Sequence, residues 1–351
     1  MEAKRFYGLD GLRGVCAITV MLFHCNDLFH SGPIFQHGFL AVDMFFILSG
    51  FVIALTYEER LKTGFGVKTF LRARAKRLLP VYWLGALLNI AIFIFILSAG
   101  YVAAPGYTPA LMIFVSVTTF FLIPQFLSPD NTPFPPLTIA WSLFMEWVAN
   151  LLYASGAFRL KTSTLLAITA AGWGLMTIVG YRLHTGWFVG VGQTDFVYGI
   201  LRAVPGFFAG VVIYRWHAAK LFDRLPAISP ELLLTLWLVI AAVPAFTATP
   251  TFDAVAVIAG CPLLLVLLIR SDAKAPSFCK PLGDISYPLY TTHRGIILLA
   301  QLTPIFGLDK HADPLRALGV VALCLAVAWG LMKITTPKMK PLKPAYCTTP
   351  G

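Results

Sequence analysis

Long apolar runs alternate with short polar connections along the whole chain of 351 residues. Ten of these runs are long enough to cross a hydrocarbon core of about 30 Å as a helix. The pattern therefore predicts an all-α polytopic membrane protein with about ten transmembrane helices. The ten runs are 12–30, 38–57, 79–100, 138–158, 163–181, 195–216, 230–248, 251–270, 282–303 and 314–334.

The distribution of positive charge indicates whether a further apolar run, at 109–127, crosses the membrane. Cytoplasmic loops of membrane proteins collect Lys and Arg. Six basic segments lie on one side of the membrane only if an even number of crossings separates residues 78 and 158. We therefore expect 109–127 to be re-entrant or interfacial, and both termini to be cytoplasmic. The basic segments, with 22 of the 27 Lys and Arg residues, are 1–13, 58–78, 158–162, 215–224, 270–280 and 333–343.

Composition supports this assignment and limits the possible partners. The chain is 58% hydrophobic and only 12% charged, whereas soluble domains carry about 25% charged residues. The net charge is +11, and most of the positive residues lie in the predicted cytoplasmic loops. Membrane topology therefore explains the charge, and nucleic acid is not an expected partner. We expect a single membrane-embedded domain, 1–351, in the plasma (inner) membrane. Lys4 and Arg5 precede the first run, but no small-residue cleavage site follows it, so it is not a removable signal peptide.

The six cysteines are scattered through the chain and show no metal-binding spacing. Four of them lie in apolar runs, which indicates small buried hydrophobic side chains. The chain also has no P-loop and no GxGxxG motif. The sequence therefore predicts no metal site and no permanently bound cofactor.

Polar residues in the first apolar run are the first candidates for function. Arg13 and His24 are eleven positions apart, which places them on one helical face with a separation of about 16 Å. Asp10 precedes them near the same surface. Ionisable groups at membrane depth usually face a protein interior or a water-filled path. We expect this face to line a site that crosses most of the bilayer, with Arg13 at the cytoplasmic end.

Asp43 in the second run lies at a depth similar to that of His24, according to the predicted topology. A carboxylate beside an imidazole fixes its tautomer and stabilises its protonated form, as a general base requires. The alternative is a buried His–Asp pair that only joins two helices.

The segment 68–83, KTFLRARAKRLLPVYW, is unusually basic. Arg72, Arg74 and Arg77 could bind phosphate groups at a cytosolic opening, because guanidinium groups match phosphate oxygens. The alternative is an interfacial amphipathic helix on anionic lipid. Pro80 is expected to open the third span.

Later runs contribute further candidates for a polar cavity. Glu146 lies inside the run 138–158, and Arg202, expected in mid-span beside Pro205, is a plausible partner for its carboxylate. Tyr287 and His293 lie in the run 282–303. A single histidine such as His293 is more often structural than catalytic.

Six segments together resemble the integral-membrane acyltransferase-3 family. Each segment alone is a weak signal, but the six occur in the family's order in a chain of the family's length. After Glu146 the chain departs from the family pattern and reads WVANLLY, which puts in doubt any role for the residues just after it. The six segments are LDGLRGVCAITVMLFH, GFLAVDMFFILSGFVI, FLRARAKRLLPVYW, AWSLFMEW, LRAVPGFFAG and LGDISYPLYTTH.

The resemblance implies transfer of an acyl group, most often acetyl, from cytosolic acyl-CoA to a hydroxyl group. The acceptor would be a sugar of a polysaccharide or glycolipid, or sometimes a small molecule. The family's functional histidine corresponds to His24, and its arginines correspond to Arg13, Arg74 and Arg77. The chain is expected to be the membrane module alone, with polysaccharide biosynthesis or export proteins as possible partners.

Combined with the helix geometry, the resemblance gives a mechanistic hypothesis. Arg13, Arg72, Arg74 and Arg77 hold the phosphates of acyl-CoA, and His24, oriented by Asp43, is the general base. Two other classes remain open at this point. The buried polar groups could serve a proton-coupled transporter, or the chain could be an assembly subunit of a polysaccharide export system.

Overall fold

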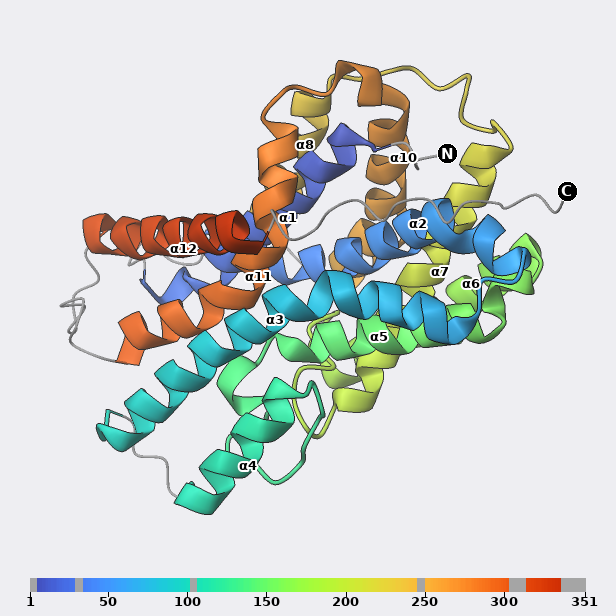
Figure 1. The fold of residues 1–351 in the computed structure, drawn as a ribbon. Coiled ribbons are helices and arrows are strands. Elements are labelled where there is room, and N and C mark those ends of the chain that lie inside the picture. The colour runs from blue at the N-terminus through green and yellow to red at the C-terminus, as the bar shows by residue number, and fades with distance from the viewer. Residues whose placement is uncertain (1–4, 29–33, 102–105, 245–249, 303–313, 336–351) are drawn as a thin grey trace, which may run out of the picture.

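The fold of the chain in the computed structural model is helical, with no β-strand among the residues described (Figure 1). These residues are 5–28, 34–101, 106–244, 250–302 and 314–335. The apolar runs thus fold as the sequence predicts. The longer helices are α1 (Tyr7–His24), α2 (Ala41–Lys62), α3 (Val67–Ser98), α4 (Pro109–Phe120), α5 (Ala140–Ser155), α6 (Thr162–Leu183), α7 (Gly199–Ala218), α8 (Pro230–Ala242), α9 (Pro250–Val255), α10 (Cys261–Ser271), α11 (Cys279–Leu302) and α12 (Pro314–Thr335).

Each of the ten predicted spans overlaps a helix or, in the case of α9 and α10, two consecutive helices, although α8 covers only Pro230–Ala242 of the run 230–248. Six stretches in the described part are long and apolar enough to cross a membrane, so the chain is a multi-pass membrane protein. The count of ten crossings and the cytoplasmic termini stay predictions. The six stretches are Gly38–Lys62, Val67–Ser98, Thr162–Leu183, Phe196–Ala218, Pro250–Lys274 and Ala317–Thr335.

The ambiguous run 109–127 forms a helix only over Pro109–Phe120, which is 12 residues. At 1.5 Å per residue this helix is about 18 Å long, shorter than the hydrocarbon core. The chain then turns at Leu122, which has a positive φ of 57°. A helix of this length does not cross the bilayer by itself, and its place relative to the membrane stays a prediction.

Pro80 lies inside α3 and does not open it, contrary to the sequence-based expectation. The basic segment and the third span form one continuous helix of 32 residues. Proline removes one backbone hydrogen bond, but membrane helices tolerate it where neighbouring groups satisfy the freed carbonyl. The arginines of this segment are therefore fixed to the same rigid element as the span.

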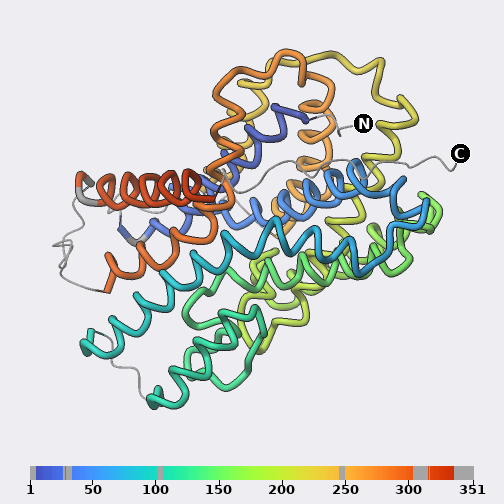
Figure 2. Tube along the Cα trace, in the orientation of Figure 1, coloured from blue at the N-terminus to red at the C-terminus, as the bar shows by residue number. Residues whose placement is uncertain are grey.

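Two pairs of parallel helices pack with their backbones close together. Along α1 and α11, which lie side by side in Figure 2, a Cβ atom at Gly14 would come within 2.5 Å of Leu282. Along α2 and α7, a Cβ atom at Gly50 would lie 1.8 Å from the carbonyl oxygen of Phe207. Small residues at such positions allow helices to approach closely.

Replacing Gly50 by alanine should destabilise the protein by about 3 kcal/mol, because the added carbon meets backbone that cannot rotate away. Thermal unfolding of the purified protein in detergent measures this effect. Gly174→Ala in α6 is the matched control, since nothing lies within 4 Å of its Cβ position. Equal unfolding temperatures for the two variants would contradict the close packing of α2 and α7.

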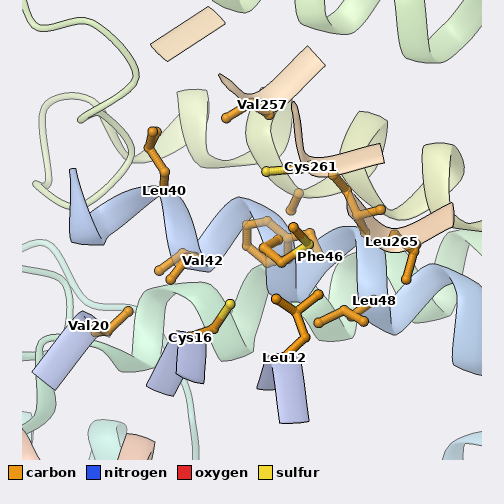
Figure 3. Close-up of a cluster of buried hydrophobic side chains, with 14 of the residues drawn as sticks. Leu12, Cys16, Val20, Leu40, Val42, Phe46, Leu48, Val257, Cys261 and Leu265 are labelled. Carbon is orange, nitrogen blue, oxygen red and sulfur yellow. The ribbon is translucent and has the colours of Figure 1, made fainter. Parts of the chain in front are cut away.

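The apolar core is built around α2. Figure 3 shows side chains of α1, such as Leu12 and Cys16, on one side of α2, and Val257, Cys261 and Leu265 on the other. A π-helical stretch, Ala256–Gly260, joins α9 to α10 just before Pro262. A proline at this position lacks an N–H group and crowds the carbonyl four residues earlier, so local widening of the helix is expected.

Five cysteines in the described part are buried and not bonded to one another, as predicted for small hydrophobic side chains. They are Cys16, Cys25, Cys261, Cys279 and Cys324; Cys347 lies outside the described residues.

Candidate active site

His24, the last residue of α1, lines a small cavity of about 50 Å³. Five of the twelve lining residues are aromatic, and they come from five different segments. Polar groups come from His24, Thr138, Arg202 and the Tyr290 hydroxyl. Cavities with apolar walls and a few converging polar groups are typical small-molecule sites. The aromatic residues of the wall are Phe23, Phe39, Trp141, Phe188 and Tyr290.

The imidazole of His24 stacks on that of His293. Their ring centroids are 5.3 Å apart and their planes differ by 29°. His293 Nδ1 lies 2.9 Å from the carbonyl oxygen of Leu289, and because a carbonyl only accepts, Nδ1 carries the proton. His293 Nε2 is buried and has no hydrogen-bond partner within the described part of the chain. The structure therefore brings the two predicted histidines together, with His24 on the cavity and His293 behind it.

The structure does not pair Asp43 with His24, so this part of the hypothesis is wrong. Asp43 Oδ1 accepts from Arg202 Nε at 3.0 Å, and Asp43 Oδ2 accepts from Arg202 Nη2 at 2.6 Å. Asp43 was expected at the depth of His24, and its neighbour Val42 does line the same cavity. Depth alone does not fix rotation about the helix axis, and the Asp43 side chain points to α7.

Arg202 is fully buried and lies in the first turn of α7, not in mid-span. Besides Asp43, it donates to the carbonyl oxygens of Val189 and Phe39 and lies 5.1 Å from the ring centroid of Trp141. It therefore holds two segments of the cavity wall together, and Glu146 is not its partner.

Glu146 instead pairs with Arg74, which corrects the expected Glu146–Arg202 pair. Glu146 Oε1 accepts from Arg74 Nη2 at 2.9 Å and from the Ser49 hydroxyl at 2.7 Å. Arg74 is only 5% exposed. Its Nε atom is buried without a partner among the described residues, so this guanidinium keeps a free donor.

Three of the four predicted phosphate-binding arginines form one cluster. Arg77 interacts electrostatically with Arg74, Arg13 and Glu146. Arg13 lies 3.5 Å from Asp10 and keeps 28% of its side chain exposed. The cluster of Arg13, Arg74 and Arg77 has three positive charges, against the two negative charges of the adjoining Asp10 and Glu146.

Arg72 does not belong to this cluster. It is exposed, and on the α3 helix it lies one turn before Lys76, on a different face from Arg74. Helix geometry therefore separates the arginines of the basic segment into an inward group and an outward one.

α11 connects the arginine cluster with the cavity of His24. Tyr287 interacts electrostatically with Arg74 and Glu146, and its hydroxyl donates to the carbonyl of Leu78 at 3.2 Å. One turn further on, the Tyr290 hydroxyl lies 2.6 Å from that of Ser142, and Tyr290 lines the cavity. The predicted site residues of α1 and α11 thus both extend from the arginine cluster to the cavity of His24.

A buried His–Asp pair, which the structure forms between α9 and the segment before α2, was not expected from the sequence. His37 Nδ1 lies 2.8 Å from Asp253 Oδ1, and Asp253 Oδ2 accepts from the backbone N–H of Trp187 at 3.0 Å. Trp187 precedes Phe188 of the cavity wall, so Asp253 fixes that wall from behind. The available signal was an aspartate inside the apolar run 251–270.

Glu58 and Arg215 form another buried pair that the sequence analysis missed, at the opposite ends of α2 and α7 from Asp43 and Arg202. Glu58 also accepts from the Tyr153 hydroxyl at 2.8 Å. The two ion pairs fix the register of these parallel helices. In the described part of the chain, no three His, Cys, Asp or Glu side chains are placed to hold a metal ion.

The sequence matches the acyltransferase domain family over residues 6–333, and the chain belongs to this family. The protein is therefore an enzyme of the acyltransferase class, as its six motifs indicated. No solved structure matches the chain.

Three curated relatives illustrate what the chain is similar to. "Protein 2 in picA locus" of Rhizobium radiobacter is 36% identical over 177 residues, which are 48% of this chain and 92% of that protein. A Staphylococcus aureus (strain COL) protein named as an O-acetyltransferase is 30% identical over 40% of this chain and 22% of its own length. The exopolysaccharide production protein ExoZ of Rhizobium meliloti is 29% identical over 39% of each chain. The latter two matches cover well under half of those relatives.

Proposed function

We propose that this protein transfers an acetyl group from acetyl-CoA to a hydroxyl group of a polysaccharide or lipid-linked sugar. The observation that carries the proposal is the arrangement along α1: cationic side chains cluster around Arg13 at one end, and His24 lines a cavity at the other. The names of the O-acetyltransferase and exopolysaccharide relatives support the acetyl group and the sugar acceptor.

The arginine cluster would bind the phosphate groups of the donor. Arg74 has a buried Nε donor without a partner in the described region, and Arg13 and Arg77 keep accessible side chains. Guanidinium groups donate in a geometry that fits phosphate oxygens. From Arg13 to His24 the helix rises about 16 Å, a distance that the extended pantetheine arm can span.

His24 would act as the general base. It takes the proton from the acceptor hydroxyl as the hydroxyl oxygen attacks the thioester carbonyl, so that a C–O bond forms. The C–S bond then breaks, and the thiolate of CoA receives the proton from the His24 imidazolium. A transient acyl-His24 is the alternative order of the same exchange, and a pre-steady-state burst of released CoA would distinguish it from direct transfer.

The aromatic wall suits a carbohydrate acceptor. Sugar rings present C–H faces that pack on aromatic side chains, and Phe23, Phe39 and Trp141 provide such surfaces around His24. The donor would enter from the cytoplasmic face and the acceptor from the opposite face of the plasma (inner) membrane. A transporter is not favoured, because both buried carboxylates that it would use are paired with arginines, Asp43 with Arg202 and Glu146 with Arg74.

Replacing Arg77 by glutamine should raise the KM for acetyl-CoA about tenfold or more and change kcat little. A hydrogen bond to a charged group contributes about 1.5–3 kcal/mol, and Arg77 makes its contact with the donor away from the reacting atoms. Steady-state transfer of labelled acetyl to exopolysaccharide from a deletion strain measures both constants.

Lys68→Gln is the matched control, since Lys68 is an exposed cation of the same helix that lies two turns before the cluster. It should leave both constants unchanged. An unchanged KM in Arg77→Gln, or no transfer of label by the wild-type protein, would contradict the proposed donor site.

A further inference from the structure

A groove between α3 and α12 adjoins the arginine cluster, with which it shares Arg77, and its other lining residues lie outside the candidate active site. Lys76 and Arg77 form its basic end, and Pro80, Leu84 and Ile334 form its apolar part. Along α3 the order is fixed: the two cations come first, and the apolar side chains follow one and two turns later. From Lys76 to Leu84 the helix rises about 12 Å.

Both walls of this groove belong to helices that are apolar and long enough to cross a membrane. The apolar part of α3 begins directly after Arg77, and Thr335, the last residue of α12, also lines the groove. The groove therefore begins where the hydrocarbon core begins, on the side where Lys and Arg collect. Leu84 is 41% exposed and Ile334 is 62% exposed, so the apolar part faces outward from the fold.

The order of chemistry along the groove matches a phospholipid. A headgroup phosphate would lie at Lys76, and an acyl chain would lie along Pro80, Leu84 and Ile334. Basic pockets between transmembrane helices on the cytoplasmic side bind anionic headgroups. A zwitterionic headgroup would add an ammonium group beside two cations, which is less favourable.

We propose that this groove binds one anionic phospholipid, with its phosphate on Lys76 and its acyl chain against α12. The basic segment then has two roles on two helical faces. Arg74 points inward to Glu146, whereas Lys76 points outward to the lipid. These two roles explain why the basic segment has more Lys and Arg residues than membrane topology alone requires.

Native mass spectrometry of the full-length protein in detergent tests the proposal, with phosphatidylglycerol as the probe. Wild-type protein should retain one phosphatidylglycerol in preference to phosphatidylcholine. Lys76→Gln should weaken this binding about fivefold, because a cation near the headgroup contributes about a factor of five. Leu84→Trp, which fills the apolar part of the groove, should weaken it as well and keeps both cations.

Lys68→Gln removes an equal charge from the same helix and should bind phosphatidylglycerol as the wild-type protein does. Equal weakening in Lys68→Gln and Lys76→Gln would overturn the proposal, because the attraction would then be diffuse. Competition of inorganic phosphate or acetyl-CoA for the site at the affinity of the lipid would also overturn it. Lys76→Gln leaves the arginine cluster intact, so it tests lipid binding without testing the binding of acetyl-CoA.

Discussion

His24→Gln should lower kcat for acetyl transfer by 10²- to 10⁴-fold, the usual contribution of a general base. Glutamine fills much of the space of the imidazole and forms hydrogen bonds, but it cannot take a proton at neutral pH. Folding should change little, because His24 lies at the end of α1 on a cavity and forms no side-chain ion pair in the described structure. Labelled acetyl transfer by purified protein gives the rate.

The matched control for this variant is His184→Asn. His184 is an exposed histidine that ends α6 with a φ of 55°, a left-handed conformation that asparagine tolerates. It should keep wild-type turnover. Turnover of His24→Gln within a few-fold of the wild type would remove His24 from the mechanism.

The second large effect concerns stability. Asp43→Leu or Arg202→Met alone should destabilise the protein by about 3–5 kcal/mol, because each leaves one buried charge without its partner. Both side chains are 1% exposed and form two hydrogen bonds with each other. Thermal unfolding in detergent measures the loss.

The double variant Asp43→Leu/Arg202→Met should recover most of the stability, since apolar replacement of a whole buried pair is often neutral. It should also recover part of the activity, because His24 is untouched. If Asp43 instead oriented His24, Asp43→Leu would lose turnover with normal stability and Arg202→Met would not restore it. A double variant no more stable than either single variant would contradict the pairing.

Sequence alone was sufficient for the helices and for the polar face of α1. Hydropathy and length predict that the ten apolar runs contain helices and that the cysteines are buried, as the described residues show. The re-entrant or interfacial place of 109–127 stays a prediction. Arg13 and His24 share a face because the helical period dictates it, and the structure places Arg13 beside the arginine cluster and His24 on the cavity. These are local properties that a single helix determines.

Partners across helices could not be predicted in the same way. The predicted topology was sufficient to estimate the depth of Asp43 in the membrane. It did not predict that α2 packs against α7 at Gly50 and Phe207, where Asp43 lies beside Arg202. The pairing of Glu146 with Arg74 also depends on helix packing. Because α3 continues without interruption through Pro80, the basic segment is part of the same rigid helix and brings Arg74 to Glu146 on α5. Rotation and neighbours are set by helix packing, which depends on residues far apart in sequence.

His37 and Asp253 show the same limit. They are 216 residues apart, and neither belongs to a motif that points to the other. Their pairing follows from the packing of α9 beside the segment that precedes α2. It supports the cavity wall through Trp187, and only the folded chain brings these residues together.

In the proposed mechanism, one end of α1 helps to bind the donor and the other end activates the acceptor. The most direct test measures the equilibrium binding of acetyl-CoA and its turnover on the same preparations of His24→Gln and Arg77→Gln. We expect His24→Gln to bind acetyl-CoA as the wild type does but to transfer at least 100-fold more slowly, whereas Arg77→Gln should bind it weakly and transfer at a near-normal rate when saturated. Weak donor binding in His24→Gln with normal turnover at saturation would contradict this division of the site.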